Sequence, residues 1–509
     1  MPAHPLNATL LPRPTTARAR PGAFTFHADT CLRVGTGAED AARLLRTLLA
    51  PATGLPLRPA ADGPVALALD PHLTGLGSEG YGLTIGPHSV VLRAARLTGL
   101  LRGVQTIRQL LPAQALAPEP QHGVPWSLPC AEITDVPHHP WRGAMLDVAR
   151  HFQPVDYLRR YVDLLALHKI NVFHLHLTDD QGWRMPVTAY PKLTEIGGHR
   201  SRSMIGATGD DHDGTPHTGA YTRAELAGLV EYAAARGVTV MPEIEMPGHV
   251  RAALAAYPRL GNDPDRTLDV WTRWGVCDTV LGVHDEVLDF CRTVLEEVMD
   301  LFPSPYIHIG GDECPLTEWE RSPVAEARIR AEGLSGPAAL HRWFLGRVGE
   351  FLVRNGRHPV GWAETGTELP DDFTVMAWRD PAHALAAARH GHDVINAHYR
   401  ATYLDYAQTT DPREPRAQPG AVVALRDVHG HDPVPTGASP DAAARVLGTQ
   451  AQLWTEFAAT PERLEHLTYP RLCALADRAW SGPTAWHDFR SRLDRHTTRL
   501  DALGVHRHR

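Results

Sequence analysis

Two adjacent carboxyl residues, Asp312 and Glu313, follow a short apolar segment and two glycines in the sequence Tyr306-Ile307-His308-Ile309-Gly310-Gly311-Asp312-Glu313. An Asp-Glu pair is usually a solvated surface feature, but an apolar segment that leads directly into it predicts the end of a buried strand. A carboxylic acid beside a carboxylate can protonate a leaving oxygen while its partner carries negative charge. The pair is therefore the first candidate for acid–base chemistry. Glu243 and Glu245, which alternate on another apolar segment, are the second candidate.

Polar and aromatic residues also follow the other apolar segments in this part of the chain. They include Arg150-His151, Thr178-Asp179-Asp180, Trp362-Ala363-Glu364, Trp378-Arg379-Asp380, Tyr403-Leu404-Asp405 and Trp454-Thr455-Glu456. Indole rings stack on the C–H faces of sugars, while carboxylates and arginine bind sugar hydroxyl groups. If these segments end at one rim, the residues that follow them describe a carbohydrate site.

The apolar segments alternate with amphipathic helical stretches, which is the pattern of consecutive βα units. Eight such segments occur, at residues 143–148, 171–177, 238–244, 306–309, 359–362, 374–378, 393–397 and 446–454. Helices are expected at residues 157–167, 222–235, 287–301 and 340–353, the second opened by a capping box of Thr222 and Glu225. Eight units close a (β/α)8 TIM barrel, which places the residues after the strands at its catalytic mouth.

The first part of the chain has a different pattern. Short strands are expected at residues 65–69, 81–85 and 89–92, and helices at residues 41–49 and 100–111. We therefore expect a smaller α/β accessory domain at residues 1–137, followed by the barrel at residues 138–509.

Composition excludes several classes of protein. The 509 residues carry a net charge of -8, which disfavours a nucleic-acid binder. The six cysteines lie far apart, which disfavours a zinc ribbon or a disulfide scaffold. No apolar run approaches the roughly 20 residues that span a membrane. Residues 1–21 contain prolines and arginines without the apolar core of a secretion signal, so we expect a cytoplasmic protein.

A second interpretation is a metal-dependent hydrolase. His174 and His176 lie two residues apart, so their side chains share one face of a strand, and Asp179, His249 and Asp312 could complete a metal site. The ordinary alternative is a pair of hydrogen-bonded histidines in the barrel interior.

Five segments of the barrel resemble the family 20 glycoside hydrolases, the β-N-acetylhexosaminidases. They are the Asp312-Glu313 segment above, Arg142-Gly-Ala-Met-Leu-Asp-Val-Ala-Arg150-His-Phe152, Phe173-His-Leu-His-Leu-Thr-Asp-Asp-Gln-Gly-Trp-Arg184, Met241-Pro-Glu-Ile-Glu-Met-Pro-Gly-His249 and Gln452-Leu-Trp-Thr-Glu456. Residues 103–110 also resemble the end of the family's accessory domain. The resemblance implies retaining hydrolysis of terminal β-linked N-acetylhexosamine, in which the substrate's own acetamido oxygen forms an oxazolinium ion.

The resemblance also implies roles for single residues. Glu313 is the general acid and later the base, Asp312 orients the acetamido N–H, and Tyr403 binds the acetamido carbonyl. Trp362, Trp378 and Trp454 form the walls of the acetamido pocket. Arg150, Asp405 and Glu456 bind sugar hydroxyl groups, and Asp179 and His249 form a hydrogen-bonded pair that tunes Glu313. The substrate is a small glycan, with no metal, cofactor, nucleic acid or membrane involved. A non-catalytic sugar-binding protein is the third interpretation, and the choice between GlcNAc and GalNAc and the oligomeric state stay open.

Overall fold

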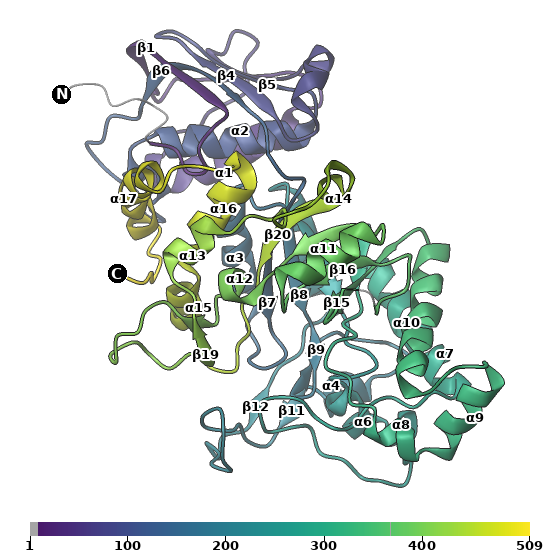
Figure 1. Cartoon of the computed structure of the whole chain (residues 1–509). Coiled ribbons are helices and arrows are strands. Elements are labelled where there is room, and N and C mark those ends of the chain that lie inside the picture. The colour runs from purple at the N-terminus through teal and green to yellow at the C-terminus, as the bar shows by residue number, and fades with distance from the viewer. Residues whose placement is uncertain (1–8, 367) are drawn as a thin grey trace.

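The computed structural model describes residues 9–366 and 368–509, which form two units of different architecture (Figure 1). The N-terminal unit is a six-stranded sheet of order β1-β6-β4-β5-β3-β2 with two long helices packed on one face. Its elements are β1 (Thr16–Thr25), β2 (Leu32–Val34), α1 (Glu39–Thr53), β3 (Val65–Leu69), β4 (Tyr81–Ile85), β5 (Val90–Ala94), α2 (Leu97–Leu110) and β6 (Ser127–Asp135), with 3-10 turns at Pro71–Leu76 and Ala113–Leu116. The expected strands and helices are present, whereas β1, β2 and β6 were not expected.

The second unit is a closed barrel of eight parallel strands, which confirms the predicted fold class. The strands are β7 (Trp141–Asp147), β8 (Val172–His176), β13 (Thr239–Glu243), β14 (Tyr306–His308), β15 (His358–Ala363), β16 (Thr374–Ala377), β17 (Val394–Asn396) and β20 (Val446–Ala451). Each overlaps one of the eight apolar segments. β20 pairs with β7, so the last strand closes the barrel against the first.

Helices surround the barrel and bury their apolar faces against its outer surface (Figure 1). The longer helices are α3 (Val155–Leu167), α5 (Arg223–Ala234), α7 (Asp285–Leu301), α9 (Pro323–Ala331), α10 (Pro337–Arg354), α11 (Pro381–Arg389), α15 (Pro461–Thr468), α16 (Arg471–Ser481) and α17 (Trp486–Ala502). The predicted capping box of Thr222 and Glu225 opens α5. None of the helices in the described ranges combines the length and apolar character needed to cross a membrane.

Shorter elements lie in the connections. The helices are α4 (Lys192–Glu195), α6 (Arg251–Ala256), α8 (Thr317–Arg321), α12 (Tyr399–Thr402), α13 (Leu425–Gly430), α14 (Pro440–Ala444) and a 3-10 turn at Pro258–Leu260. The strands form two-residue to five-residue ladders: β9 (Thr178–Asp179) with β10 (Gly182–Trp183), β11 (His199–Arg200) with β12 (His217–Thr218), and β18 (Tyr406–Ala407) with β19 (Gln418–Val422). Several of these connections follow barrel strands and therefore build the C-terminal mouth.

Along each barrel strand, successive side chains point alternately into the barrel interior and outward to the surrounding helices. On β8, Phe173 and Leu175 belong to the core between strands and helices, while Val172 belongs to a separate cluster inside the barrel with Met241, Trp362 and Met376. His174 and His176 alternate with the outward residues, so they share the interior face with Val172. The interior is thus apolar near the N-terminal ends of the strands and polar toward the mouth.

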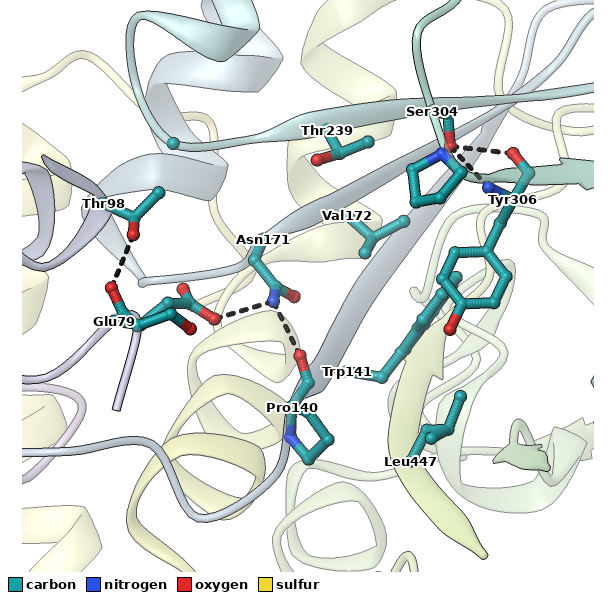
Figure 2. Close-up of a pocket in the computed structure, with 13 residues that line it drawn as sticks. Glu79, Thr98, Pro140, Trp141, Asn171, Val172, Thr239, Ser304, Tyr306 and Leu447 are labelled. Carbon is teal, nitrogen blue, oxygen red and sulfur yellow. Dashed lines mark hydrogen bonds between the residues drawn. The ribbon is translucent and has the colours of Figure 1, made fainter. Parts of the chain in front are cut away.

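Buried charges join the two units at the opposite end of the barrel. Lys169 Nζ lies 2.6 Å from Asp135 Oδ2 and 4.6 Å from the centre of the Trp480 ring. A second contact centres on Glu79, which lines a pocket of about 380 Å³ between the units (Figure 2). Glu79 accepts from Asn171 Nδ2 at 3.0 Å and pairs with Arg142 of the barrel at 2.5 Å.

Burial opposes ionisation of Glu79, but Arg102 and Arg142 lower the pKa of this carboxyl to about 2. Glu79 is therefore an anion over the whole neutral range. Arg102 belongs to α2 and Arg142 to β7. The Glu79 carboxylate therefore forms ion pairs with both units.

Candidate active site

A cavity of about 210 Å³ lies at the C-terminal mouth of the barrel and collects residues from the ends of most strands. It is lined by Arg150, Asp179, Glu245, His249, Asp312, Glu313, Trp378, Tyr403, Asp405, Tyr406, Gln418, Trp454 and Glu456. All predicted site residues except Trp362 are in this set. Trp362 is 1% exposed and donates its indole N–H to Glu243 at 2.7 Å, so it lies beneath the cavity in the barrel interior.

The backbone after β14 turns sharply and presents the carboxyl pair. Gly310 and Gly311 have φ angles of 67° and 93°, and Glu313 itself adopts the left-handed region at φ 45°. Only glycine fits at position 310, because an added Cβ would lie 1.7 Å from Glu245 Oε2. Gly310 therefore allows the buried carboxyl group of Glu245 to approach the backbone two residues before Asp312.

His249 stands behind both members of the carboxyl pair. Its Nε2 atom is 3.8 Å from Asp312 Oδ2 and 3.7 Å from Glu313 Oε2, while Nδ1 is 3.2 Å from Asp179 Oδ1 and 3.3 Å from Asp180 Oδ2. Burial works against the charge, but Asp179 and Asp180 raise the pKa of His249 well above its usual range. A cationic imidazole therefore faces the two groups.

The carboxyl pair is electrostatically asymmetric. Burial raises the pKa of Asp312 to about 7; the positive charge of His249 limits this shift, and the negative charge of Glu313 adds to it. The side chain of Asp312 is 12% exposed to solvent, and that of Glu313 is 30% exposed. Asp312 is thus about half-protonated near neutral pH, whereas an ordinary aspartate is fully ionised there.

Glu245 was only a second candidate in the sequence, but in the structure it lines the cavity. It is fully enclosed, and neither carboxyl oxygen has a hydrogen-bond partner among the described residues. Burial, with the charges of Asp312 and Glu243, raises its pKa well above the usual range. Glu245 is therefore a neutral acid that can donate a hydrogen bond at the floor of the cavity.

Three aromatic side chains form another part of the cavity lining. The rings of Trp378 and Tyr403 are stacked, with centroids 6.1 Å apart and planes 16° apart, and Trp454 lies 6.3 Å from Tyr403. Burial, reinforced by Asp312 and Asp405, raises the pKa of Tyr403 well above its usual range. The phenol therefore keeps its proton and can act as a donor inside the cavity.

Arg150 and two carboxyl groups form the polar side of the site. Arg150 Nη2 lies 2.8 Å from Asp179 Oδ2, and its guanidinium group lies 5.0 Å from the centre of the Trp454 ring. Burial raises the pKa of Asp405 well above normal, and the charge of Glu456 adds to the shift. Burial likewise raises the pKa of Glu456. These carboxyl groups face the cavity and can exchange hydrogen bonds with hydroxyl groups.

Three of the four ring nitrogens of the two β8 histidines make hydrogen bonds with described residues. His176 Nδ1 bonds to Glu243, and its Nε2 is 2.9 Å from Asp179 Oδ2. His174 Nδ1 accepts from Gln450 Nε2 at 2.8 Å. This geometry agrees with hydrogen-bonded histidines of the barrel interior. Binding a cation through His176 would require it to release one of its two carboxylate partners.

A second cavity of about 290 Å³ adjoins the first and shares Arg150, His249, Glu313, Gln418 and Glu456 with it. Its other lining residues are Ala207, Trp274, Gly275, Val276, Pro419 and Phe457. Ala207 lies in the connection between β11 and β12, and Pro419 lies on β19. Trp274 lies in the long connection before α7, which has no periodic pattern, so no signal in the sequence pointed to it.

Comparison with known proteins agrees with this geometry. Residues 139–483 match the glycosyl hydrolase family 20 catalytic domain, and residues 7–136 match domain 2 of the same family. A β-hexosaminidase of Porphyromonas gingivalis is 39% identical over 439 residues, which cover 85% of this chain and 55% of that protein. A β-N-acetylhexosaminidase of Cellulomonas fimi is 33% identical, with 99% and 96% of the two chains covered.

Solved structures give the same result. A GH20 exo β-N-acetylglucosaminidase from Vibrio harveyi in complex with N-acetylglucosamine superposes with a TM-score of 0.89 at 30% identity, covering 100% of this chain and 80% of the other. The GH20 β-N-acetylhexosaminidase of Streptomyces coelicolor A3(2) superposes with a TM-score of 0.85 at 33% identity, covering 99% and 98%. The resemblance first carried by the Asp312-Glu313 segment is confirmed, and the chain belongs to glycosyl hydrolase family 20.

Proposed function

We propose that this family 20 glycosidase is a β-N-acetylhexosaminidase that removes terminal β-linked GlcNAc or GalNAc from small glycans, with retention of configuration. The observation that carries the proposal is that Asp312, Glu313 and Tyr403 line one and the same cavity. Two acidic groups and a phenol around one sugar-sized space can act together on an acetamido group and the neighbouring glycosidic bond.

In the first step Tyr403 donates a hydrogen bond to the acetamido carbonyl, and the ionised form of Asp312 accepts one from the acetamido N–H. The carbonyl oxygen attacks the anomeric carbon as the bond from that carbon to the leaving oxygen breaks. Glu313 gives its proton to the leaving oxygen. Positive charge develops on the acetamido group, and the Asp312 carboxylate balances it.

In the second step the Glu313 carboxylate takes a proton from water, and the water oxygen attacks the anomeric carbon. The bond to the acetamido oxygen breaks, which restores the acetamido group and leaves Glu313 protonated. Two successive inversions at one carbon retain the β configuration. Trp378 and Trp454 enclose the sugar, and Arg150, Asp405 and Glu456 bind its hydroxyl groups.

The test compares two chromogenic aryl glycosides that differ only at carbon 2, one with an acetamido group and one with a hydroxyl group. Rapid release of the aryl alcohol from the acetamido compound alone, with β-configured sugar as the first product by NMR, supports the proposal. Equal rates on both compounds would refute substrate assistance. Binding of N-acetylglucosamine without release of the aryl group would favour the sugar-binding alternative.

Two further assignments remain proposals. We infer that the accessory domain ends at about residue 137, because β6 ends at Asp135 and β7 begins at Trp141. We also propose a reducing, cytoplasmic location, because all six cysteines are free thiols. Limited proteolysis at the junction and fractionation of the native host with activity staining test these two points.

A further inference from the structure

A line of alternating carboxyl and imidazole groups runs from the barrel interior to the acid–base pair. In order, its members are Glu243, His176, Asp179, His249 and then Glu313 with Asp312. Glu243 bonds to His176 Nδ1, His176 Nε2 is 2.9 Å from Asp179 Oδ2, and Asp179 Oδ1 is 3.2 Å from His249 Nδ1. His249 Nε2 completes the line, 3.7 Å from Glu313 Oε2.

His176 is the interior member whose protonation state the geometry defines. Both of its ring nitrogens face carboxyl oxygens, and a neutral imidazole carries only one N–H donor. A doubly protonated ring satisfies both carboxylates at once. His176 is completely enclosed, with the Trp454 ring edge-on at 4.9 Å.

The charges around His176 agree with this state. Glu243 on β13, Asp179 on β9 and Asp147 on β7 face it from three elements. Burial opposes the charge, yet these carboxylates raise the pKa of His176 to about 10. His176 is thus a cation throughout the range in which the enzyme would work.

The far end of the line is anchored. Glu243 Oε1 accepts from Trp362 Nε1 at 2.7 Å and lies 2.7 Å from His308 Nδ1. These two side chains come from β15 and β14, so Glu243 on β13 is tied to two further strands. Glu243 therefore holds His176 rigidly, and His176 in turn fixes the orientation of Asp179.

We propose that His176 is a positioning residue for the hydrolysis: as a buried imidazolium it acts together with Arg150, which lies 2.8 Å from the same Asp179 oxygen, to hold Asp179 ionised and oriented, so that His249 stays charged beside Asp312 and Glu313. This inference rests on the proposed function. It extends the pair of Asp179 and His249, expected from the sequence, by two residues into the barrel interior. It also gives His176, the second histidine of the H-x-H pattern on β8, a role in catalysis that needs no metal.

The alternative is that His176 only fills the barrel interior. In that case its replacement lowers stability, but it changes neither the pH dependence nor the response to the leaving group. Asn and Gln separate the two views, because the Asn amide lies near the position of Nδ1 and the Gln amide near that of Nε2. His176→Asn can keep the bond to Glu243 and loses Asp179, while His176→Gln can keep a donor toward Asp179 without the charge.

His174→Gln is the matched control. His174 is equally enclosed, lies on the same face of the same strand and approaches the same Glu243 carboxylate, but it bonds to Gln450 and not to Asp179. All three variants and the wild type are assayed for kcat and KM across pH on aryl N-acetyl-β-glucosaminides with good and poor leaving groups. The melting temperature is measured in parallel.

We expect His176→Asn to lose roughly ten- to hundredfold in kcat on the poor leaving group with little change in KM, by analogy with the loss of a hydrogen-bonded partner behind a metal-binding histidine. Loss of a cation favours protonated carboxyl groups, so the acidic limb of its profile should move to higher pH. His176→Gln should recover part of kcat. His174→Gln should melt lower without the shift in pH profile.

Three results would overturn the inference. They are an unchanged profile and leaving-group dependence in both folded His176 variants, an equal shift in His174→Gln, or Gln no better than Asn. If His176→Asn does not fold, the profile of His176→Gln against His174→Gln decides. A wild-type enzyme without glycosidase activity would instead refute the proposed function, so the two failures are distinguishable.

Discussion

Glu245 packs directly against the backbone of Gly310, so that a Cβ atom at residue 310 would lie 1.7 Å from Glu245 Oε2. The contact places a neutral carboxylic acid behind Asp312, the group proposed to hold the substrate's amide. Position 310 therefore couples the shape of the turn after β14 to the orientation of Asp312.

Gly310→Ala should damage the site out of proportion to its size. The added methyl group must displace Glu245 or the turn, and alanine is disfavoured at the φ of 67° found here. We expect a loss of about 1–3 kcal/mol in stability and a marked fall in kcat, measured by thermal unfolding and steady-state kinetics. Gly333→Ala is the control, because Gly333 has nearly the same φ of 66° but a Cβ there would meet nothing within 4 Å. Equal kcat in the two variants would argue against the coupling.

Glu313→Gln and Asp312→Asn should differ in their dependence on the leaving group. Without its acid the enzyme cannot protonate a poor leaving oxygen, so Glu313→Gln should lose roughly two to four orders of magnitude in turnover there. It should lose less on an activated aryl group. Asp312→Asn should be slow on both, because charge develops on the acetamido group in either case. Equal losses for both variants on every substrate would contradict the assigned roles.

The acidic limb of kcat/KM should report Asp312. Burial, together with the negative charge of Glu313, raises the pKa of Asp312 to about 7 despite His249, and the reaction requires the anion. A raised pKa means that the anion is lost as pH falls through about 7, so kcat/KM should decrease toward acid pH. Asp312→Asn removes this titration. Persistence of the same limb in its residual activity would assign the titration to another group.

Asp135→Asn should loosen the joint between the two units without touching the site. It leaves the Lys169 ammonium, now 2.6 Å from a carboxylate, buried without its counter-charge. Breaking a buried pair in this way costs about 3–5 kcal/mol, visible as a lower midpoint in denaturant. Asp371→Asn removes the partner of an exposed pair and should cost below about 1 kcal/mol. Unequal specific activity of the folded variants would show that the joint also affects catalysis.

The barrel was predictable because its strands are short, apolar and regularly spaced, and because their polar ends carry the family's segments. The six-stranded sheet of the N-terminal unit was harder to predict. β1 contains Arg18, Arg20 and Pro21 and is largely exposed, so neither alternation nor hydrophobicity distinguished it from a loop.

The active site, too, was predictable only in part. The positions of Tyr403 and Asp405 after an apolar segment suggested the rim, and both side chains line the cavity, but position in the sequence could not show that the Trp362 indole bonds to Glu243 in the barrel interior. Spacing made Glu245 only a second candidate, because its importance depends on two carboxyl oxygens that the surrounding fold leaves without hydrogen-bond partners among the described residues. Side-chain direction and unsatisfied bonding are properties of the assembled structure.

The backbone angles at His249 and Glu313 limit how this enzyme could be made more resistant to heat. Both residues adopt left-handed conformations, at φ 52° and 45°. Glycine at either position would relieve local strain. The same exchange would delete the imidazole or the acid, so a stability screen would enrich inactive proteins at these two sites. Selection for thermal tolerance therefore has to act elsewhere, and the ion pairs between the two units are a place where it can act without loss of turnover.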